Sequence, residues 1–443
     1  MFRGKSVSIM TRTCAVASLV IVLGATGASS VVARAKAPAP VTKLKSTATI
    51  NSVTLTWVNP KAGTFSNLMI RRSTGPVAPA TNKAGTLIAN LGATRTSYVD
   101  KTVHASSRYS YSVFAFKGAL YSLAAKTSVV TLTPPAVPTV FSGGSYGFNN
   151  PYDVAYADKA IWVANRDGNS VTEMSATNGS LVKVLSGGSF GFNQPDGLAF
   201  DGTNLWVANG GSNTVTEINA STGAWVQTLS SSTYGFNEPY GMAVANGDVW
   251  VANYGAGVSE FSAATGSFVR ALTDTSFKFS GPFSVSAADG HIFVANIGGG
   301  VTEINASDGS FIQMAGTSCH MSQPRASTAE GSEIWVTDES GNAVCVINAS
   351  TGTMVRSITT ATVPFNYPEG ITSSTSFVWV VNSGNSYSSA YSVMELSAST
   401  GALVKTYSGS TYHFGTPLGI AYDGSHLWVG NAGGNSVTQI PVS

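Results

Sequence analysis

The sequence predicts an all-β protein: a β-sandwich followed by a seven-bladed β-propeller. One proline recurs seven times between residues 151 and 417, at spacings of 42 to 49 residues. An aromatic residue follows each of these prolines after eleven positions, and six of the seven aromatics are Trp. A repeat of this length is typical of a four-stranded propeller blade. No helical period of 3.6 residues competes with the pattern. The prolines are Pro151, Pro195, Pro239, Pro282, Pro324, Pro368 and Pro417, and the aromatics are Trp162, Trp206, Trp250, Phe293, Trp335, Trp379 and Trp428.

Each repeat contains four short stretches of strand-like sequence, separated by Gly and Asn. In the second repeat they are residues 196–200, 204–209, 214–219 and 224–229. The seventh repeat stops at residue 443 before its fourth strand. Residues 138–148 match residues 403–414, which hold the fourth strand of the sixth repeat. We therefore expect the propeller to cover residues 137–443 and its N-terminal strand to complete the last blade, which removes an exposed sheet edge.

The preceding segment, residues 38–134, predicts a separate β-sandwich domain. Pro38 and Pro40 open it, and prolines 134 and 135 close it. Short strand-like stretches cover residues 52–58, 68–72, 96–100 and 109–116, and the first of them alternates apolar residues with Thr. About 100 residues of short strands at this spacing favour a sandwich.

The N-terminus, residues 1–35, reads as a secretory signal peptide. Arg3, Lys5 and Arg12 form a basic region, residues 15–24 are apolar, and small residues follow them. The alternative is an uncleaved membrane anchor, because no charge lies between Arg12 and Arg34. We expect cleavage, a secreted or cell-wall-associated protein, and no stable membrane insertion afterwards.

Charge divides the chain into two halves that the net charge of +2 conceals. Residues 1–134 hold 16 Lys and Arg against one acid, Asp100, whereas residues 135–443 hold 8 against 21 acids. A hydrophobic content of 43% excludes a disordered chain. The basic domain is expected either to contact anionic wall polymers or to dock on the acidic propeller, and salt would weaken both contacts. We expect no nucleic-acid partner.

Two families resemble these domains. Trp57, residues 70–73 (Ile-Arg-Arg-Ser), residues 97–103 and the Tyr109-x-Tyr111 pair resemble a bacterial fibronectin type III domain, with Tyr109 at its tyrosine corner. This resemblance implies a spacer or adhesive module without catalytic residues. Residues 207–209 (Val-Ala-Asn) and 215–223 (Val-Thr-Glu-Ile-Asn-Ala-Ser-Thr-Gly) resemble NHL/YVTN-type propellers and, more loosely, the virginiamycin B lyase propeller.

The lyase resemblance implies a His base with a metal-linked carboxylate. The sequence places no His with an acid at a repeated mouth position, so we expect no catalytic residue, metal or cofactor. His291 and His426 share one repeat position, which indicates turn surface. His320, near Arg325, is either a catalytic base or a loop residue, and we favour the loop residue.

The residue after each repeated proline varies most, and it begins the innermost strand near one mouth of the channel. Aromatic residues there can stack on apolar ligand faces, and fixed charges can orient polar groups. The alternative is that these residues merely close the top of the ring. The candidate ligand-binding residues are Tyr152, Asp196, Tyr240, Phe283, Arg325, Glu369 and Leu418.

The fifth repeat departs most from the pattern. Cys319 replaces an aromatic residue in the turn before Pro324, and Cys345 replaces the Thr or Ser of the third strand. Paired changes in one repeat, in an oxidising compartment, favour a Cys319–Cys345 disulfide over two free thiols or apolar fillers.

Five third strands carry a glutamate at one repeat position. A ring of carboxylates could bind cations, but these residues lie on third strands, outside the channel, and are too far apart around the ring to share a cation. We therefore expect them to be solvated or bonded between blades. They are Glu173, Glu217, Glu260, Glu303 and Glu395.

The sequence therefore predicts a secreted, non-catalytic binding or scaffold protein. Its contacts would lie at the channel mouth and in the loops of the fifth and sixth repeats, including residues 383–391. The partner would be an extracellular protein, a glycan or a cell-wall polymer. The alternative is a secreted enzyme, either a lyase-like propeller or a carbohydrate-active protein.

Overall fold

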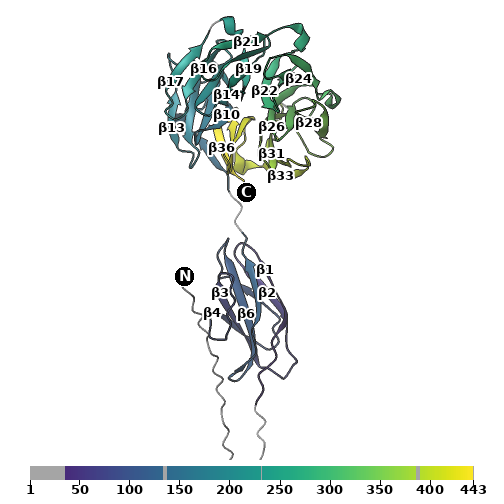
Figure 1. Ribbon diagram of the computed structural model, residues 1–443. Helices are drawn as coiled ribbons and strands as arrows, with labels where there is room; N and C mark the ends of the chain where they lie inside the picture. The colour runs from purple at the N-terminus through teal and green to yellow at the C-terminus, as the bar shows by residue number, and fades with distance from the viewer. Residues whose placement is uncertain (1–34, 133–136, 231, 386–389, 443) are drawn as a thin grey trace, which may run out of the picture. The chain divides into compact units, whose positions relative to one another are not determined.

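The computed structural model describes residues 35–132, 137–230, 232–385 and 390–442. The predicted signal peptide lies outside the described residues except for Ala35, and so does the middle of the 383–391 insertion. In the described part of the chain, no helix has the length and apolar character needed to cross a membrane. The chain divides into two compact units, Met1–Pro135 and Ala136–Ser443, called the first and second units below (Figure 1).

The first unit is a β-sandwich of two antiparallel sheets. The three-stranded sheet has the order β1-β2-β5, and the other has the order β4-β3-β6-β7 with β8 also paired to β6. Val53, Leu55 and Trp57 alternate with exposed or half-buried residues on β2 and form the core with Ile70 and Tyr111. The strands are β1 (Thr42–Ala48), β2 (Val53–Val58), β3 (Asn67–Thr74), β4 (Thr86–Gly92), β5 (Ser97–Asp100), β6 (Arg108–Lys117), β7 (Leu120–Tyr121) and β8 (Ala125–Val130).

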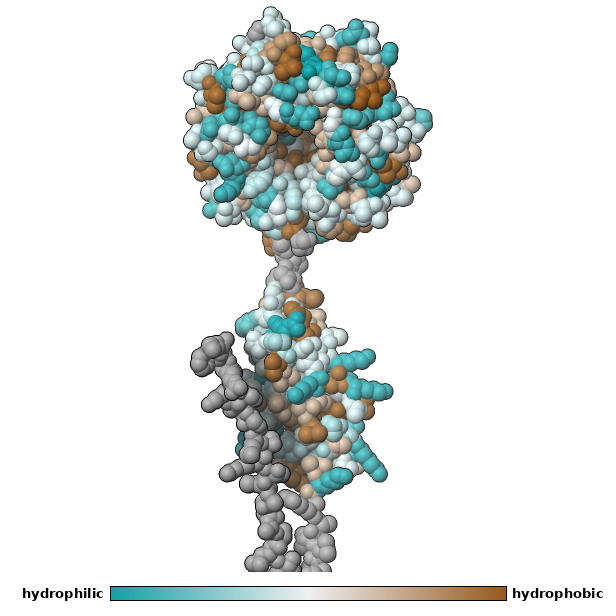
Figure 2. Space-filling view, in the orientation of Figure 1, coloured by the Kyte–Doolittle hydropathy of each residue, from teal (hydrophilic) through white to brown (hydrophobic). Residues whose placement is uncertain are grey.

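The second unit consists of four-stranded antiparallel sheets, and its described residues form seven of them, numbered one to seven in chain order. The first strand of each sheet contacts the first strand of the next, and β34 contacts β10. The first strands thus surround a central axis, where Figure 2 shows a hollow. The first strands are β10 (Pro151–Ala157), β14 (Pro195–Phe200), β18 (Pro239–Ala245), β22 (Pro282–Ala288), β26 (Pro324–Glu330), β30 (Pro368–Ser373) and β34 (Pro417–Tyr422).

The second strands carry the repeated aromatic residue, which is fully buried between neighbouring sheets. Trp162, for example, packs against Leu198 and Leu205 of the next sheet. The second strands are β11 (Ala160–Asn165), β15 (Asn204–Asn209), β19 (Asp248–Asn253), β23 (His291–Asn296), β27 (Glu333–Asp338), β31 (Phe377–Asn382) and β35 (His426–Asn431). The third strands are β12 (Ser170–Ser175), β16 (Thr214–Asn219), β20 (Val258–Ser262), β24 (Val301–Asn305), β28 (Ala343–Asn348), β32 (Ser392–Ser397) and β36 (Ser436–Pro441).

The outer strand of sheet seven comes from the start of the unit. β9 (Thr139–Ser142) pairs with β36, and its Phe141 stacks on Trp428 with ring centroids 5.7 Å apart. The first and last strands of the unit thus share one sheet. The other outer strands are β13 (Leu181–Leu185), β17 (Trp225–Leu229), β21 (Phe268–Leu272), β25 (Phe311–Ala315), β29 (Met354–Thr359) and β33 (Leu403–Ser408). Single 3-10 turns lie between sheets at η1 (Gly144–Tyr146), η2 (Ser232–Tyr234), η3 (Thr275–Phe277), η4 (Thr317–Cys319) and η5 (Ser410–Tyr412).

Within the described residues, a buried polar network joins five of the sheets to the turns that precede them. In sheet one, Asn165 Nδ2 donates to Thr172 Oγ1 (2.8 Å), and Thr172 Oγ1 donates to the carbonyl of Tyr146 (2.7 Å). The same arrangement recurs in other sheets, which explains the repeated Asn without assigning it a ligand. Sheet five has the predicted disulfide in this place, because Cys345 stands at the Thr position and bonds to Cys319 of the turn.

The repeated third-strand glutamates are buried, so of the two expected arrangements, solvation and bonding between blades, solvation is wrong. Each lies beside the buried aromatic residue of the second strand, as Glu173 does beside Trp162. Lys183 lies 3.5 Å from Glu173, and it also donates to the carbonyl of Thr222 in the next sheet. The glutamates therefore bind side chains of their own sheet, and those side chains make the contact between sheets.

Candidate functional site

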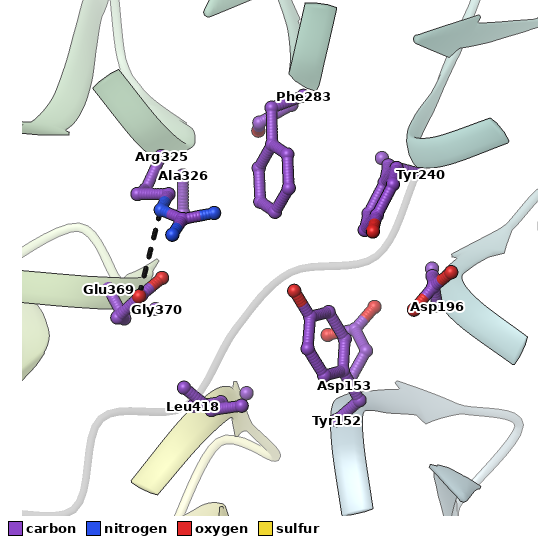
Figure 3. A pocket seen from close by; sticks show the side chains of 14 residues that line it. Tyr152, Asp153, Asp196, Tyr240, Phe283, Arg325, Ala326, Glu369, Gly370 and Leu418 are labelled. Atoms are coloured by element: carbon purple, nitrogen blue, oxygen red, sulfur yellow. Dashed lines mark ion pairs between the residues drawn. The ribbon is translucent and has the colours of Figure 1, made fainter. Parts of the chain in front are cut away.

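The seven residues predicted at the channel mouth come together in one pocket (Figure 3). The strand pairing shifts register directly after each repeated proline, as it does between Pro151 and Asp153. Such a bulge turns a side chain out of the regular alternation of a strand, and bulges often lie beside binding sites. The cavity volume of the pocket is about 130 Å³, below the roughly 300–1,000 Å³ of pockets that enclose a drug-sized ligand, so the pocket has room for a small group or for one end of a longer ligand.

The next residue of each inner strand is small because the inner strands approach closely. A Cβ on Gly197 would lie 2.0 Å from the carbonyl oxygen of Tyr240, and one on Gly370 would lie 2.1 Å from that of Leu418. Sheet one is the exception, since Asp153 occupies this position. Its carboxylate accepts the N–H groups of Val154 and of Leu198 in the next sheet.

Aromatic side chains form one side of the pocket. The rings of Tyr240 and Phe283 stack with centroids 4.7 Å apart, and Tyr152 lies 6.4 Å from Tyr240. Figure 3 shows these three rings along one side, with Arg325 and Glu369 opposite them and Leu418 between. The pocket thus combines an aromatic wall with a charged wall.

An ion pair lies behind the aromatic wall. Arg166 Nε is 2.7 Å from Asp196 Oδ1, and the guanidinium also donates to the hydroxyl of Tyr240 (3.1 Å). The same guanidinium lies over the ring of Tyr152, 5.1 Å from its centroid. Burial raises the pKa of Asp196 to about 7, even though Arg166 opposes the shift.

The charged wall holds one guanidinium and two carboxylates. Arg325 Nε donates to Glu339 Oε2 (2.6 Å) and lies 3.6 Å from Glu369 Oε1. Arg325 also covers the ring of Phe283, 4.8 Å from its centroid. Burial and the neighbouring Glu339 charge raise the pKa of Glu369 although Arg325 lowers it.

Asp153, Arg166 and Glu339 belong to this site but were not predicted from the sequence. Asp153 had a detectable signal, because it is the one charged residue at a repeat position otherwise held by Gly, Ser or Ala. Arg166 and Glu339 each follow the repeated Asn or Asp of a second strand, a position that varies as strongly as the one after proline. Burial raises the pKa of Asp153 to about 6, although its two backbone N–H donors oppose the shift.

The histidines considered for catalysis lie elsewhere. His320 is exposed, and the described residues that line the pocket do not include it. His291, which was expected on the surface of a turn, is half-buried, and its Nδ1 lies 2.7 Å from a carboxylate oxygen of Glu303. The predicted disulfide is present, with Cys319 and Cys345 Cα atoms 6.0 Å apart. Within the described ranges, no group of three or more His, Cys, Asp or Glu residues could hold a metal ion.

The sequence matches one known family of repeat proteins. The model described as outer membrane protein assembly factor BamB covers residues 158–407, more than half of the chain, from near the start of β11 to β33. The chain belongs to this BamB family. The match includes five of the seven candidate mouth positions, from Asp196 to Glu369. None of the curated proteins matches this BamB-family chain.

Several solved structures are similar to this BamB-family protein over about two thirds of its length. Hydrazine synthase of Kuenenia stuttgartiensis has a TM-score of 0.53 at 15% identity, over 68% of this chain and 97% of that one. A streptogramin B lyase also has a TM-score of 0.53, at 14% identity, with the same coverage of the two chains. The Cps50 (Swd1) β-propeller domain of Myceliophteria thermophila gives 0.53 at 12% identity, over 69% of this chain and all of that domain. These likenesses confirm the predicted β-propeller fold, and they carry no function.

Proposed function

We propose that this chain is a secreted, non-catalytic binding protein that holds its ligand at the mouth of the propeller. The observation that carries the proposal is the convergence of the most variable repeat positions on one pocket. Residues needed for the fold repeat from sheet to sheet, whereas Tyr152, Arg325 and Glu369 differ and still meet around one space. The ligand would be an extracellular protein, a glycan or a cell-wall polymer.

We further propose that the second unit is a seven-bladed propeller of the NHL/YVTN type, closed by β9. The pairing of β9 with β36 and the contact of β34 with β10 support a closed ring. The first unit is proposed as a fibronectin type III-like sandwich. Its support is the two-sheet order and Tyr109, whose hydroxyl accepts the backbone N–H of His104 (3.0 Å) as in a tyrosine corner.

Membership of the BamB family favours binding over catalysis. The family description names an assembly factor, which is a role played by contact with other molecules. Propellers also serve as enzymes, so the fold by itself decides nothing.

The first unit would act as a spacer or as the contact to the cell wall. Between residues 35 and 132 the only acid is Asp100, and it is fully buried and bonded to Arg72 (2.7 Å). The cationic side chains around it are mostly exposed. Between residues 35 and 132 the surface therefore carries cations and no exposed carboxylate of Asp or Glu. A surface of this kind attracts polyanions.

The proposal is tested by binding to a glycan array and to cell-wall preparations. Tyr240→Ala and Phe283→Ala should abolish binding, since they remove the aromatic wall. Trp225→Ala is the matched control, because Trp225 is an exposed aromatic residue on the outer strand β17. Binding that survives both mouth variants, with thermal unfolding unchanged, would refute a site at the mouth.

One observation favours the alternative, a secreted enzyme. Asp153 and Asp196 have pKa values raised to about 6 and about 7 by burial, and carboxyl groups in this range can act as general acids. Turnover on a panel of glycans that is lost in Asp153→Asn and retained in Trp225→Ala would establish the enzyme. Ligand binding without turnover would support the binding protein.

A further inference from the structure

The carboxylates of the mouth outnumber its cations. Four acids (Asp153, Asp196, Glu339 and Glu369) surround two guanidiniums. Arg166 is held by Asp196 at 2.7 Å and Arg325 by Glu339 at 2.6 Å. Glu369 then shares Arg325 at the longer distance of 3.6 Å, and no Lys or Arg of the described residues pairs with Asp153. The site therefore holds more carboxyl groups than its own cations pair with.

One of these acids also presents an unused acceptor. Asp196 is only 3% exposed, yet its Oδ2 accepts no hydrogen bond within the described part of the chain. A buried carboxylate oxygen without a donor is costly, and it is satisfied when a ligand supplies an N–H group. Asp196 lines both the mouth pocket and a neighbouring pocket, and its Oδ2 lies toward Gly210 of that second pocket, where an added Cβ would be 2.3 Å away.

The aromatic wall has the geometry that attracts cations. Arg166 already lies over Tyr152 at 5.1 Å and Arg325 over Phe283 at 4.8 Å, so these ring faces hold positive groups within the protein itself. A cation within about 6 Å of a ring centroid gains roughly 0.5–2 kcal/mol. Tyr240 contributes a third ring beside them.

An anionic ligand does not fit this arrangement. Near either guanidinium it would meet the carboxylates that pair with its Nε, which are Glu339 and Glu369 at Arg325 and Asp196 at Arg166. A neutral ligand would leave the surplus carboxylates buried beneath it without compensation. The pKa values of Asp153, Asp196 and Glu369 are raised, so these carboxyl groups are readily neutralised by protons. A cationic ligand could neutralise them in place of those protons.

We infer that the propeller mouth recognises an ammonium group carried on a flat scaffold, as in an amino sugar whose nitrogen is not acetylated. The ring edges of Tyr240 and Phe283 would contact the apolar face of the sugar, because the faces of Phe283 are already covered by Tyr240 and Arg325, and Glu369 would accept from the ammonium group. This inference rests on the proposed function, because it assigns a ligand class to the same site.

The test compares two ligands that differ by one N-acetyl group on each sugar, which removes the ammonium charge and adds an amide. Oligomers of glucosamine and of N-acetylglucosamine of equal length are titrated into the full-length protein by calorimetry at pH 6. We expect the glucosamine oligomer to bind at least about tenfold more tightly, since desolvated cation–π and carboxylate contacts are together worth more than 1 kcal/mol. Glu369→Gln should remove most of this preference.

Asp289→Asn is the matched control for Glu369→Gln. Asp289 is exposed on the turn at the far end of β22 from the mouth, and its substitution changes the net charge by the same amount. A preference that persists in Glu369→Gln, or that falls equally in Asp289→Asn, would overturn the inference because it would reflect the overall charge.

The failures of the two proposals are distinguishable. If the acetylated oligomer binds equally well and Phe283→Ala abolishes binding, the mouth is a ligand site and the ammonium inference is wrong. If either oligomer binds and Phe283→Ala changes nothing, both proposals fail. If neither oligomer binds, the ammonium inference is overturned, and the glycan and cell-wall assays decide the proposed function separately.

Discussion

The two units of this protein place their charged groups in opposite ways. In the first unit the cations are mostly exposed and the single acid, Asp100, is buried. In the second unit seven of the 21 acids are buried, and they lie beneath the mouth or between sheets rather than on the surface. These seven buried acids are Glu173, Asp196, Glu217, Glu260, Glu303, Asp338 and Glu395. A net charge read from sequence therefore describes the surface of the first unit well and that of the second poorly.

The buried acids of the two units also differ in how their surroundings shift their pKa values. Burial by itself raises the pKa of Asp100, but hydrogen bonds from Thr102, Tyr111 and Arg72 lower it overall. In the second unit burial prevails, and it raises the pKa of Glu260 to about 7 although Arg270 lies 2.6 Å away. The first unit thus stabilises an ionised carboxylate, whereas the second holds carboxyl groups that resist ionisation.

The largest expected effect comes from deleting residues 137–145, which removes β9 from the second unit. The edge of β36 would be exposed and Trp428 would lose its partner Phe141. A loss of about 4 kcal/mol would lower Tm by roughly 10 °C or more. Calorimetry should show this in the transition of the second unit alone. An unchanged second transition would contradict closure of the ring by β9.

A smaller effect is expected from breaking the Cys319–Cys345 disulfide in Cys319→Ser/Cys345→Ser. The bridge joins residues 26 positions apart, so its loss should cost about 2–4 kcal/mol and lower Tm of the second unit. The matched control is Cys319→Tyr/Cys345→Thr, which restores the residues of the other repeats and with them the Thr-to-carbonyl hydrogen bond. It should recover part of the loss. Equal Tm values for the two double variants would show that the Thr-to-carbonyl hydrogen bond of the other repeats cannot take the place of the disulfide.

The basic surface should act in binding without changing stability. Lys45 and Lys126 lie on β1 and β8, which meet where Ser46 Oγ and Thr127 Oγ1 are 2.8 Å apart. Lys45→Glu/Lys126→Glu should weaken binding of polyphosphate by about five- to tenfold, and salt should weaken what remains. Lys159→Glu/Lys278→Glu makes the same charge change on exposed residues of the second unit and should have little effect. Equal losses in the two variants would contradict a contact made by the first unit.

The smallest effect concerns pH, where the two units should respond with opposite signs. Asp153 has its pKa raised to about 6, so the folded state binds its proton more tightly than the unfolded chain does. Its contribution to stability therefore falls as pH rises from about 4 to about 6. Asp153→Asn should flatten this slope in urea unfolding of the second unit.

Asp100 supplies the internal comparison for the pH experiment. Its pKa is lowered, so its contribution is present above the ordinary pKa of Asp and is lost as pH falls below about 4. The transition of the first unit should weaken on acidification through this range and should be unaffected by Asp153→Asn. A slope in the second unit that survives Asp153→Asn would assign it to other carboxyl groups, such as Asp196 and Glu260.

Much of the site could be predicted because the chain repeats itself. When the repeats are compared, positions that differ between them stand out from those that are shared. The position after each proline differs in this way, and it includes Tyr152, Arg325 and Glu369. The paired changes at Cys319 and Cys345 identified the disulfide by the same logic. Solvation of the third-strand glutamates, one of the two expected arrangements, is wrong, because the sequence does not show that Glu173 lies beside Trp162 with Lys183 to neutralise it.

By itself, the sequence determined the repeat, the strands within it and the positions that face the mouth. These follow from local periodicity, since alternation and turn residues act over a few positions along the chain. Only the tertiary structure decided which charges meet there. Arg166 follows β11 of sheet one and pairs with Asp196 on β14 of sheet two, and Arg325 of sheet five lies 3.6 Å from Glu369 of sheet six. Contacts of this kind depend on how whole sheets pack, and no local pattern encodes them.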